Sequence, residues 1–220
     1  MQQHLLASAE IEEYANLVTQ QEPDTAAAIA DKTRNTLQYT EMLTGKVEGR
    51  FLSMLIGLTG AHRVLEVGMF TGYSAYMMAR ALPEDGEVVT LEMNERYKAI
   101  ADDCLKDDPH AKKIKVVMGN ALETIPKLQG PFDMMFLDAD KEHYPEYYEM
   151  MFPKLKTGGL FVVDNALWYG EVTDPKDRKA EAIDKLNHTI KNDPRVENVL
   201  LTVRDGIHLA RKTGDDHGTG

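Results

Sequence analysis

Acidic and amide side chains follow two apolar, strand-like runs of this sequence. Asp138 comes directly after the run 132–137, and Asp164 and Asn165 follow the run 159–163. The carboxyl ends of parallel strands meet at one edge of a sheet, so we expect these three side chains to lie near one another. Their oxygen atoms suit hard divalent cations such as Mg²⁺, Mn²⁺ or Ca²⁺. Because no histidine or cysteine joins the pattern, it does not favour zinc.

The two aspartates also have a purely structural interpretation. Asp138 and Asp164 each precede a possible helix, and an aspartate at that position commonly caps the first helical turn. Capping explains a single aspartate well, but it explains two aspartates at paired strand ends poorly. Both interpretations stay open at this point.

A turn flanked by Gly68 and Gly72 follows an earlier strand-like run, and such glycines let a backbone approach a ligand closely. A dinucleotide-binding fingerprint would have a glycine where this turn has Phe70, so a pyrophosphate would meet a bulky side chain. The acidic Glu66 just before the turn suits a cationic ligand better than a phosphate.

Glu92 ends the next run, 24 residues after Gly68, which is about the spacing at which a carboxylate binds ribose hydroxyls. The pattern indicates a nucleotide-like, cationic cofactor. In the alternative interpretation the glycines make an ordinary tight turn and Glu92 is a surface residue.

Short strand-like runs alternate with helical stretches over most of the chain, which is typical of βαβ units and a parallel sheet. The expected strands are 63–67, 87–91, 114–118, 132–137, 159–163, 196–203 and 207–210. The expected helices are 3–20, 24–42, 48–59, 73–82, 94–106, 121–128 and 144–155. Arg204-Asp205-Gly206 is a hairpin signal, so the last strand should run antiparallel. We therefore predict an α/β fold, a doubly wound sheet with an antiparallel edge strand and helices on both faces.

Composition narrows the class of protein. The 25 basic and 36 acidic side chains give a net charge of −11, which argues against nucleic acid or an anionic membrane as the main partner. A hydrophobic content of 43% is enough for one core, so we expect a single domain over 1–212 with a disordered tail over 213–220. With one cysteine, Cys104, the chain has no internal disulfide, and the absence of a signal-like start predicts a cytoplasmic protein.

The motifs together resemble the cation-dependent O-methyltransferases of the catechol and caffeoyl-coenzyme A type. The resemblance extends from Met42 to Lys212, and the order and spacing of its motifs make it specific. The motifs are Glu48-Gly49, residues 66–74, residues 119–122, residues 138–141, residues 164–168 and Asp205-Gly206. It implies a seven-stranded Rossmann-like sheet that binds S-adenosylmethionine, whose positive sulfonium would suit an acidic pocket.

The resemblance also implies roles for individual residues. The cofactor site would comprise Thr44, Glu66, Gly68, Met69, Gly72, Ser74, Glu92, Ala121 and Asp138, with Glu92 on the ribose and with Thr44 and Asp138 at the methionine end. Asp138, Asp164 and Asn165 would bind the cation, with Mg²⁺ favoured. Asp138 and Lys141 would be catalytic, with Lys141 as the general base. Lys141 has a simpler alternative, a surface salt bridge with Asp140.

The acceptor class that we expect is narrower than the family. Members that act on coenzyme A esters often have asparagine four residues after the metal-binding asparagine, and this chain has Tyr169 there. We therefore favour a small catechol-like acceptor, with caffeoyl-coenzyme A-type esters kept as an option. The resemblance and the amphipathic helix at 3–20 favour a homodimer. The competing functions are a metal-independent methyltransferase, a nicotinamide-dependent oxidoreductase, which Phe70 disfavours, and a non-catalytic module that retains the cofactor pocket.

Overall fold

The computed structural model describes residues 6–214, and the chain folds into two compact units. We call Glu13–Thr124 the N-terminal unit, and Ile125–Gly220 together with Met1–Glu12 the C-terminal unit. The helix expected over 3–20 is present as α1, Ala9–Val18, and residues 3–5 of that prediction lie outside the described residues. Residues 215–220 of the tail predicted to be disordered also lie outside them. The single domain over 1–212 stays a prediction.

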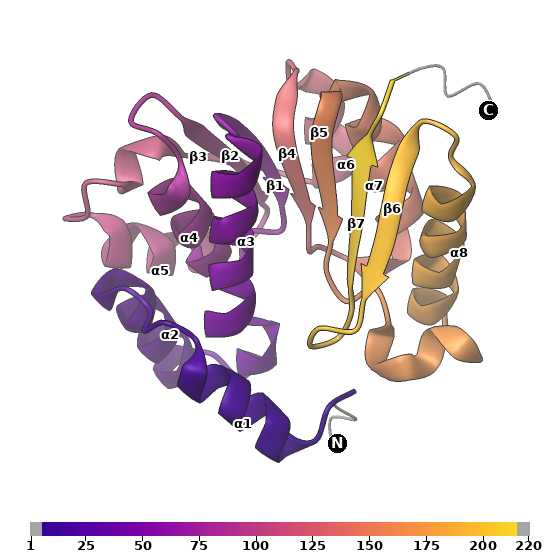
Figure 1. Ribbon diagram of the computed structural model, residues 1–220. Coiled ribbons are helices and arrows are strands. Elements are labelled where there is room, and N and C mark those ends of the chain that lie inside the picture. Colours follow the sequence, from indigo (N-terminus) through magenta and orange to yellow (C-terminus); the bar gives the residue numbers. More distant parts are fainter. Residues whose placement is uncertain (1–5, 215–220) are drawn as a thin grey trace. The chain divides into compact units, whose positions relative to one another are not determined.

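Three parallel strands in the order β3-β2-β1 form the sheet of the N-terminal unit (Figure 1). The strands are β1 (Arg63–Val67), β2 (Glu87–Glu92) and β3 (Ile114–Met118). The helices are α2 (Asp24–Thr36), α3 (Lys46–Thr59), α4 (Tyr73–Ala81), α5 (Glu95–Leu105) and α6 (Ala121–Thr124), with 3-10 turns η1 (Thr40–Met42) and η2 (Ala111–Lys113). Helices α4 and α5 pack on β2. Apolar runs on β1 and β2 are buried, as expected for strands covered by helices.

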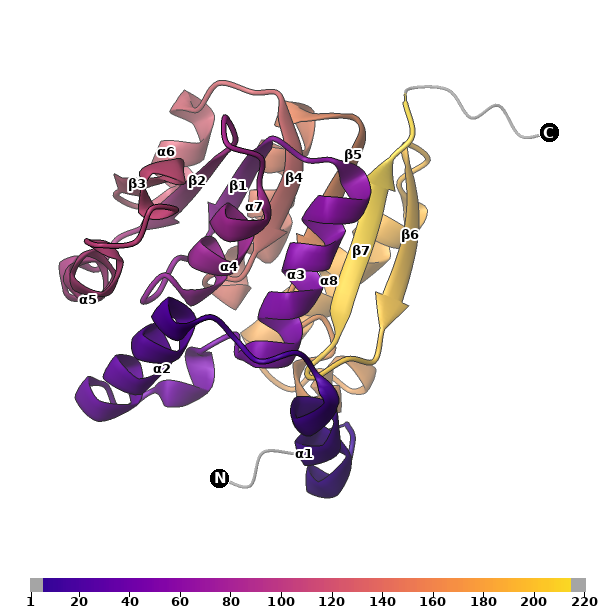
Figure 2. The ribbon, with the colours of Figure 1, turned by 60° about the vertical axis from the view of Figure 1, so that its left-hand side comes forward.

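The start of α4 is closely packed. Gly72 has φ +87°, and a Cβ placed on it would lie 3.1 Å from the Cβ of Ala101 on α5. Helix α2 contacts α4 and α5 (Figure 2). The Thr33 hydroxyl on α2 donates to the Thr71 hydroxyl beside Gly72 over 2.8 Å. The turn between β1 and α4 is therefore held from two sides.

Four strands in the order β4-β5-β7-β6 form the sheet of the C-terminal unit (Figure 1). The strands are β4 (Phe132–Leu137), β5 (Leu155–Val163), β6 (Val196–Leu201) and β7 (Ile207–Lys212). The helices are α7 (Tyr144–Met151) and α8 (Arg178–Asn192), with 3-10 turns η3 (Ile125–Lys127), η4 (Lys141–His143), η5 (Phe152–Lys154) and η6 (Trp168–Thr173). Strands β4 and β5 are parallel, whereas β7 is antiparallel to both β5 and β6. The predicted antiparallel last strand is confirmed, and it lies between β5 and β6.

Several predicted elements differ in extent from the observed ones. The helix expected over 121–128 is divided before Pro126, whose missing N–H and ring disfavour a helix interior. The helix expected over 144–155 ends at Met151 because Pro153 follows, and β5 begins four residues earlier than predicted. The helix expected over 24–42 ends at Thr36, where Leu37 becomes extended.

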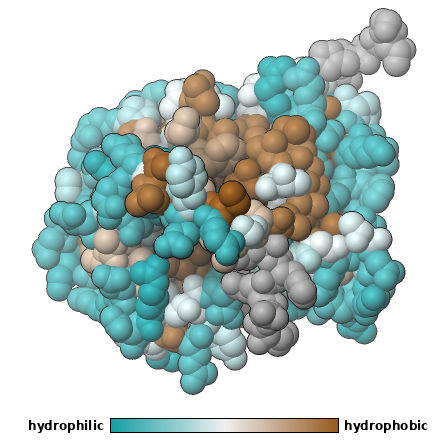
Figure 3. All heavy atoms as spheres, turned by 60° about the horizontal axis from the view of Figure 1, so that its bottom comes forward, coloured by the Kyte–Doolittle hydropathy of each residue, from teal (hydrophilic) through white to brown (hydrophobic). Residues whose placement is uncertain are grey.

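Apolar residues also reach the surface. Figure 3 shows them gathered in a brown area on one face of the molecule. Exposed apolar side chains of α1 are Ile11, Tyr14, Leu17 and Val18, and those of α3 are Met54 and Leu58. Within residues 6–214, the structure contains no helix with the length and apolar character needed to cross a membrane.

Candidate active site

The turn after β1 is tied to the end of β2 by a carboxylate. Phe70 adopts φ +51°, and its backbone N–H donates to Glu92 Oε2 over 2.8 Å. The backbone N–H groups of Met93 and Asn94 donate to Glu92 Oε1 over 2.9 and 2.8 Å. Burial raises the pKa of Glu92 above its ordinary value, and these three hydrogen bonds oppose the shift. Glu92 is thus fixed beside the turn.

Glu66 lies deeper than the turn. Its side chain is fully buried and accepts a hydrogen bond from Thr90 on the neighbouring strand. The other residues predicted to line a cofactor pocket in this unit lie at the ends of its elements: Thr44 before α3, Gly68, Met69 and Gly72 in the turn, Ser74 at the start of α4, and Ala121 at the start of α6. Of these, Thr44, Met69, Gly72 and Ser74 are buried.

The ends of β4 and β5 carry the predicted cation ligands. Asp164 N donates to Leu137 O over 3.0 Å, which places the two strand ends side by side. The Tyr144 hydroxyl from α7 donates to Asp164 O over 3.2 Å and approaches Leu137 O at 3.4 Å. Sequence reasoning missed this role of Tyr144, because its partners lie 7 and 20 residues away.

The two aspartates do not cap the helices that follow them. The residue at the N-cap of α7 is His143, and the residues at the N-caps of η4 and η6 are Asp140 and Leu167. Asp138 Oδ1 instead binds the Lys141 ammonium, and Asp164 Oδ1 accepts from the next backbone N–H at 2.6 Å. The structural alternative for these aspartates is therefore not supported by their contacts.

The charges of the site act strongly on one another. Burial, followed by the charge of Asp138, raises the pKa of Asp164 to about 6. Burial alone would lower the pKa of Lys141, but the charge of Asp138 and further groups outweighs it, so the pKa lies well above its ordinary value. The buried carboxylate of Asp164, the partly exposed carboxylate of Asp138 and the amide of Asn165 make a donor set that a divalent cation would fit.

Lys141 does not lie where a surface salt bridge with Asp140 would place it. It is 9% exposed, and its Nζ lies 2.7 Å from Asp138 Oδ1 and 4.9 Å from the centre of the Tyr144 ring. Asp140 pairs with His143 Nδ1 instead. A surface salt bridge between Lys141 and Asp140 is therefore wrong, because the 3-10 turn η4 places Lys141 against the residue three positions before it.

The loop after Asp164 contacts the hairpin between β6 and β7. Asn165 Nδ2 donates to Asp205 Oδ2 over 3.3 Å, and Tyr169 N donates to Asp205 Oδ1 over 2.5 Å. Burial raises the pKa of Asp205, and both hydrogen bonds oppose the shift. Trp168 and Tyr169 lie next in the loop, with their ring centres 5.4 Å apart.

No group of three or more His, Cys, Asp or Glu side chains within residues 6–214 is arranged to hold a metal. The candidate ligands Asp138, Asp164 and Asn165 are not such a group, because Asn165 contributes an amide and only two of the three are acidic.

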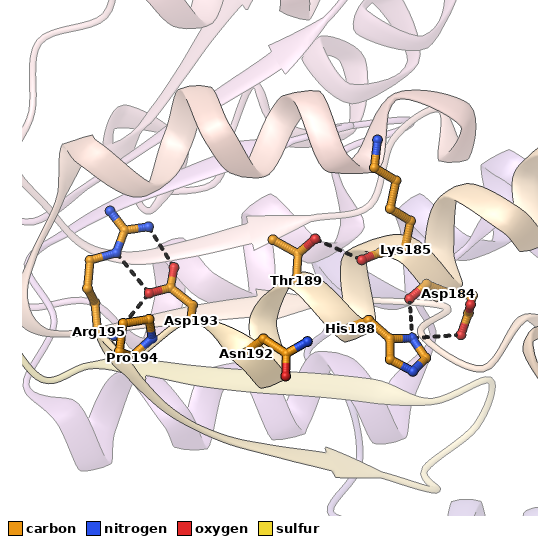
Figure 4. A pocket seen from close by; sticks show the side chains of 8 residues that line it. All are labelled: Asp184, Lys185, His188, Thr189, Asn192, Asp193, Pro194 and Arg195. Atoms are coloured by element: carbon orange, nitrogen blue, oxygen red, sulfur yellow. Dashed lines mark hydrogen bonds and ion pairs between the residues drawn. The ribbon is translucent and has the colours of Figure 1, made fainter. Parts of the chain in front are cut away.

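A separate open groove lies at the end of α8 (Figure 4). Its lining residues are Asp184, Lys185, His188, Thr189, Asn192, Asp193, Pro194 and Arg195. His188 Nδ1 binds Asp184, and Arg195 binds Asp193 through two nitrogen atoms, so these four groups already pair with one another. None of the predicted site residues lines this groove, and we assign it no role.

Comparison with known sequences identifies relatives over most of the chain. Residues 18–213 match the family described as O-methyltransferase. Caffeoyl-CoA O-methyltransferase 2 of Petunia hybrida is 38% identical over 185 residues, which cover 78% of this chain and 76% of that protein. Caffeoyl-CoA O-methyltransferase 1 of Zea mays is 35% identical over 224 residues, covering 94% of this chain and 86% of that protein.

Solved structures agree with the sequence comparison. The O-methyltransferase TomG from Streptomyces achromogenes, solved with S-adenosylmethionine (SAM), has a TM-score of 0.85 and 30% identity and covers 93% of this chain and 96% of its own. The O-methyltransferase from Bacillus cereus in complex with S-adenosylhomocysteine (SAH) has a TM-score of 0.83 and 28% identity, covering 92% and 97%. Together with the strand pairings described above, this likeness confirms the predicted α/β class, a Rossmann-like seven-stranded sheet with an antiparallel strand pair.

Proposed function

This chain belongs to the O-methyltransferase family, and from that premise we propose that it is an S-adenosylmethionine-dependent, divalent-cation-dependent O-methyltransferase with a vicinal-dihydroxy aromatic acceptor. The observation that carries the proposal is the pair of carboxylates at adjoining strand ends, Asp164, which is buried, and Asp138, which is partly exposed and contacts the Lys141 ammonium. The Asn165 amide follows Asp164 directly. Methyl transfer from S-adenosylmethionine to an oxygen atom is supported by the relatives, which are O-methyltransferases.

The cofactor assignment is supported by the relatives solved with S-adenosylmethionine or S-adenosylhomocysteine. When bound, S-adenosylmethionine supplies an electrophilic methyl group on a positively charged sulfur. On this chain, Glu92 is already oriented by three backbone N–H donors, so its carboxylate is preorganised to accept hydrogen bonds from ribose hydroxyls. We assign the turn residues Gly68 and Met69 to the same pocket.

The cation assignment is supported by the donor chemistry of Asp138, Asp164 and Asn165. A bound divalent cation would supply positive charge that favours the deprotonated form of a hydroxyl and holds a pair of oxygens in place. The burial of Asp164 and the nearby charge of Asp138 make a positive charge favourable at this position. Mg²⁺ is the expected cation, and Mn²⁺ or Ca²⁺ would fit the same oxygen donors.

Lys141 is our candidate for the residue that takes the proton from the acceptor. Its side chain is buried against Asp138, one of the residues assigned to the cation, so it lies within the same small group of charges. Proton removal by a positioned amine and alignment of the two reactants would be the chain's own contribution to the rate.

The aromatic pair Trp168 and Tyr169 directly follows the proposed cation ligands and is our candidate wall for a planar acceptor. We propose catechol-like molecules as acceptors, and the names of the plant relatives support caffeoyl-CoA-type esters as further acceptors.

The proposal is tested by measuring methyl transfer from S-adenosylmethionine to a panel of catechols and to caffeoyl-CoA, with Mg²⁺, with Mn²⁺, with Ca²⁺ and with EDTA. We expect turnover of at least one diphenol that EDTA abolishes and added cation restores. Full turnover in EDTA would make the enzyme metal-independent. Binding of S-adenosylmethionine with no turnover of any acceptor would favour a non-catalytic module.

We also propose that the protein is a homodimer. The exposed apolar side chains of α1 and α3 would gain from cover by a second copy, since burial of apolar surface favours association. Light scattering at micromolar concentration should give twice the mass of the chain. A monomeric mass would contradict the proposal.

A further inference from the structure

The backbone of the β6–β7 hairpin lies directly against the loop that begins at Asp164. Ala166 N donates to Gly206 O and Leu167 N donates to Asp205 O, both over 2.9 Å. Gly206 has φ +88°, and a Cβ placed on it would lie 2.5 Å from Leu167 Cγ. The hairpin and the loop are therefore in contact at a point where a side chain would not fit.

Three residues of this loop have backbone conformations that must be held in place by their neighbours. Asn165, Trp168 and Tyr169 have φ values of +54°, +44° and +55°, in the left-handed region that residues other than glycine rarely adopt. Residues persist in this region when their surroundings hold them there, and they concentrate at functional sites. Asn187 on α8 adds a third support, because its Nδ2 donates to Ala166 O over 2.7 Å.

The Asp205 side chain determines which way the Asn165 amide faces. An ionised carboxylate accepts hydrogen bonds and donates none, so the group that Asn165 turns toward Asp205 Oδ2 must be its NH₂. The Asn165 oxygen is then available to a cation. The other carboxylate oxygen accepts from Tyr169 N, which fixes the carboxylate in this orientation.

We propose that Asp205 is a positioning residue that makes Asn165 offer its oxygen, and not its nitrogen, to the divalent cation. The inference rests on the cation site of the proposed function. Hydrogen-bond partners behind a metal ligand commonly orient it, and their loss typically weakens metal binding about 10- to 100-fold.

The variant Asp205→Asn tests this role with little change of shape. Its one oxygen would stay with Tyr169 N, which makes the shorter bond, and its NH₂ would then face the NH₂ of Asn165. The Asn165 amide is expected to turn over and present nitrogen to the cation. We expect the Kd for Mn²⁺, followed by the electron paramagnetic resonance signal of the free ion, to rise about 10- to 100-fold. The Kd for S-adenosylmethionine should change less than about threefold.

The double variant Asp205→Asn with Asn165→Asp distinguishes a change in the orientation of the residue 165 side chain from a general loss of local structure. A carboxylate at 165 accepts from the new NH₂ and still offers oxygen, so Mn²⁺ affinity should return to within about threefold of the wild type. Asn165→Asp alone places two carboxylates face to face, so the two changes should be strongly non-additive. Glu197→Gln is the matched control, since it removes one negative charge from the same hairpin, where Glu197 pairs with Arg211, and it should bind Mn²⁺ like the wild type.

The outcomes distinguish this inference from the proposed function. A wild-type protein that does not bind Mn²⁺ would overturn both. Wild-type binding with an unchanged Kd in Asp205→Asn would overturn the inference and leave the cation site in place. Weak binding in Asp205→Asn that the second substitution does not restore would also overturn it.

Discussion

Lys141 Nζ lies 2.7 Å from Asp138 Oδ1 in an ion pair that solvent scarcely reaches. The same carboxylate is the one assigned to the cation, so the ammonium and the cation compete for its charge. A cation on Asp138 would weaken the interaction that favours the protonated lysine. The pair therefore connects cation binding with the proton transfer that we assign to Lys141.

Replacement of Lys141 tests its role as the base. Lys141→Ala should lower kcat about 10²- to 10⁴-fold at saturating cation, because a positioned base contributes on that order. The loss should shrink as pH rises, since hydroxide can then deprotonate the acceptor. Lys141→Arg should not restore the rate, because a guanidinium stays protonated. Initial rates on one catechol from neutral to alkaline pH measure all three effects.

The control for this series is Lys176→Ala, which removes an exposed lysine paired with Asp174 and should leave kcat unchanged. If Lys141→Arg turned over at nearly the wild-type rate, the lysine would have no part in proton removal. Activation of the hydroxyl would then depend on the cation alone.

Asp164→Ala tests the cation site from the other strand end. It removes one of three proposed ligands, so turnover should be nearly abolished, whereas the Kd for S-adenosylmethionine should stay close to that of the wild type. Asp138→Ala should impair both, because Asp138 is assigned to the cation and to the cofactor. Calorimetric titration of S-adenosylmethionine and rates with and without EDTA measure the two effects. Wild-type turnover of Asp164→Ala in EDTA would refute the cation site.

Glu92→Ala tests the cofactor site. It removes a charged acceptor, and a hydrogen bond to a charged group contributes about 1.5–3 kcal/mol. The Kd for S-adenosylmethionine should therefore rise about 10- to 100-fold. The control is Glu95→Ala, which should leave this Kd unchanged. Glu95 lies nearby, exposed in the first turn of α5. An unchanged Kd in Glu92→Ala would exclude it from the ribose site.

The sequence is sufficient to predict which residues lie at the strand ends, but not which contacts hold their side chains in place. Asp138, Asp164 and Asn165 follow apolar runs, and a run that is buried as a strand places the next residue at the sheet edge. The hydrogen bond from Asn165 to Asp205 spans 40 residues, and no local pattern encodes such a distance. The motif Asp205-Gly206 was visible as a hairpin signal, which gives no indication of what the Asp205 carboxylate contacts.

The extent of β5 shows a similar limit. Residues 156–159 read Lys-Thr-Gly-Gly, which suggests a loop, yet Leu155 pairs with Phe132 across an irregular register and the strand starts there. Pairing with β4 thus overrides the local preference of the two glycines.

The last prediction concerns His208, which sequence reasoning did not single out. Its ring is 3% exposed on β7, and its Nδ1 lies 2.8 Å from Asn187 Oδ1. Asn187 donates its NH₂ to Ala166 O, so its oxygen faces the ring, which must carry the proton on Nδ1. Burial lowers the pKa of His208 from 6.5 to about 4. Between about pH 4 and pH 6.5 the unfolded chain therefore binds a proton that the folded chain does not.

The contribution of His208 to stability is therefore fully present above about pH 6.5 and is lost as the pH falls toward 4. The difference in pKa corresponds to about 3 kcal/mol of the free energy of unfolding. Urea unfolding at pH 7, 5.5 and 4 should show that His208→Gln loses less stability on acidification than the wild type, by about that amount. His62→Gln, at a largely exposed histidine near Asp85, is the control for the loss of a histidine side chain. If His208→Gln and the wild type lost stability in parallel, protonation of His208 would not contribute to acid unfolding.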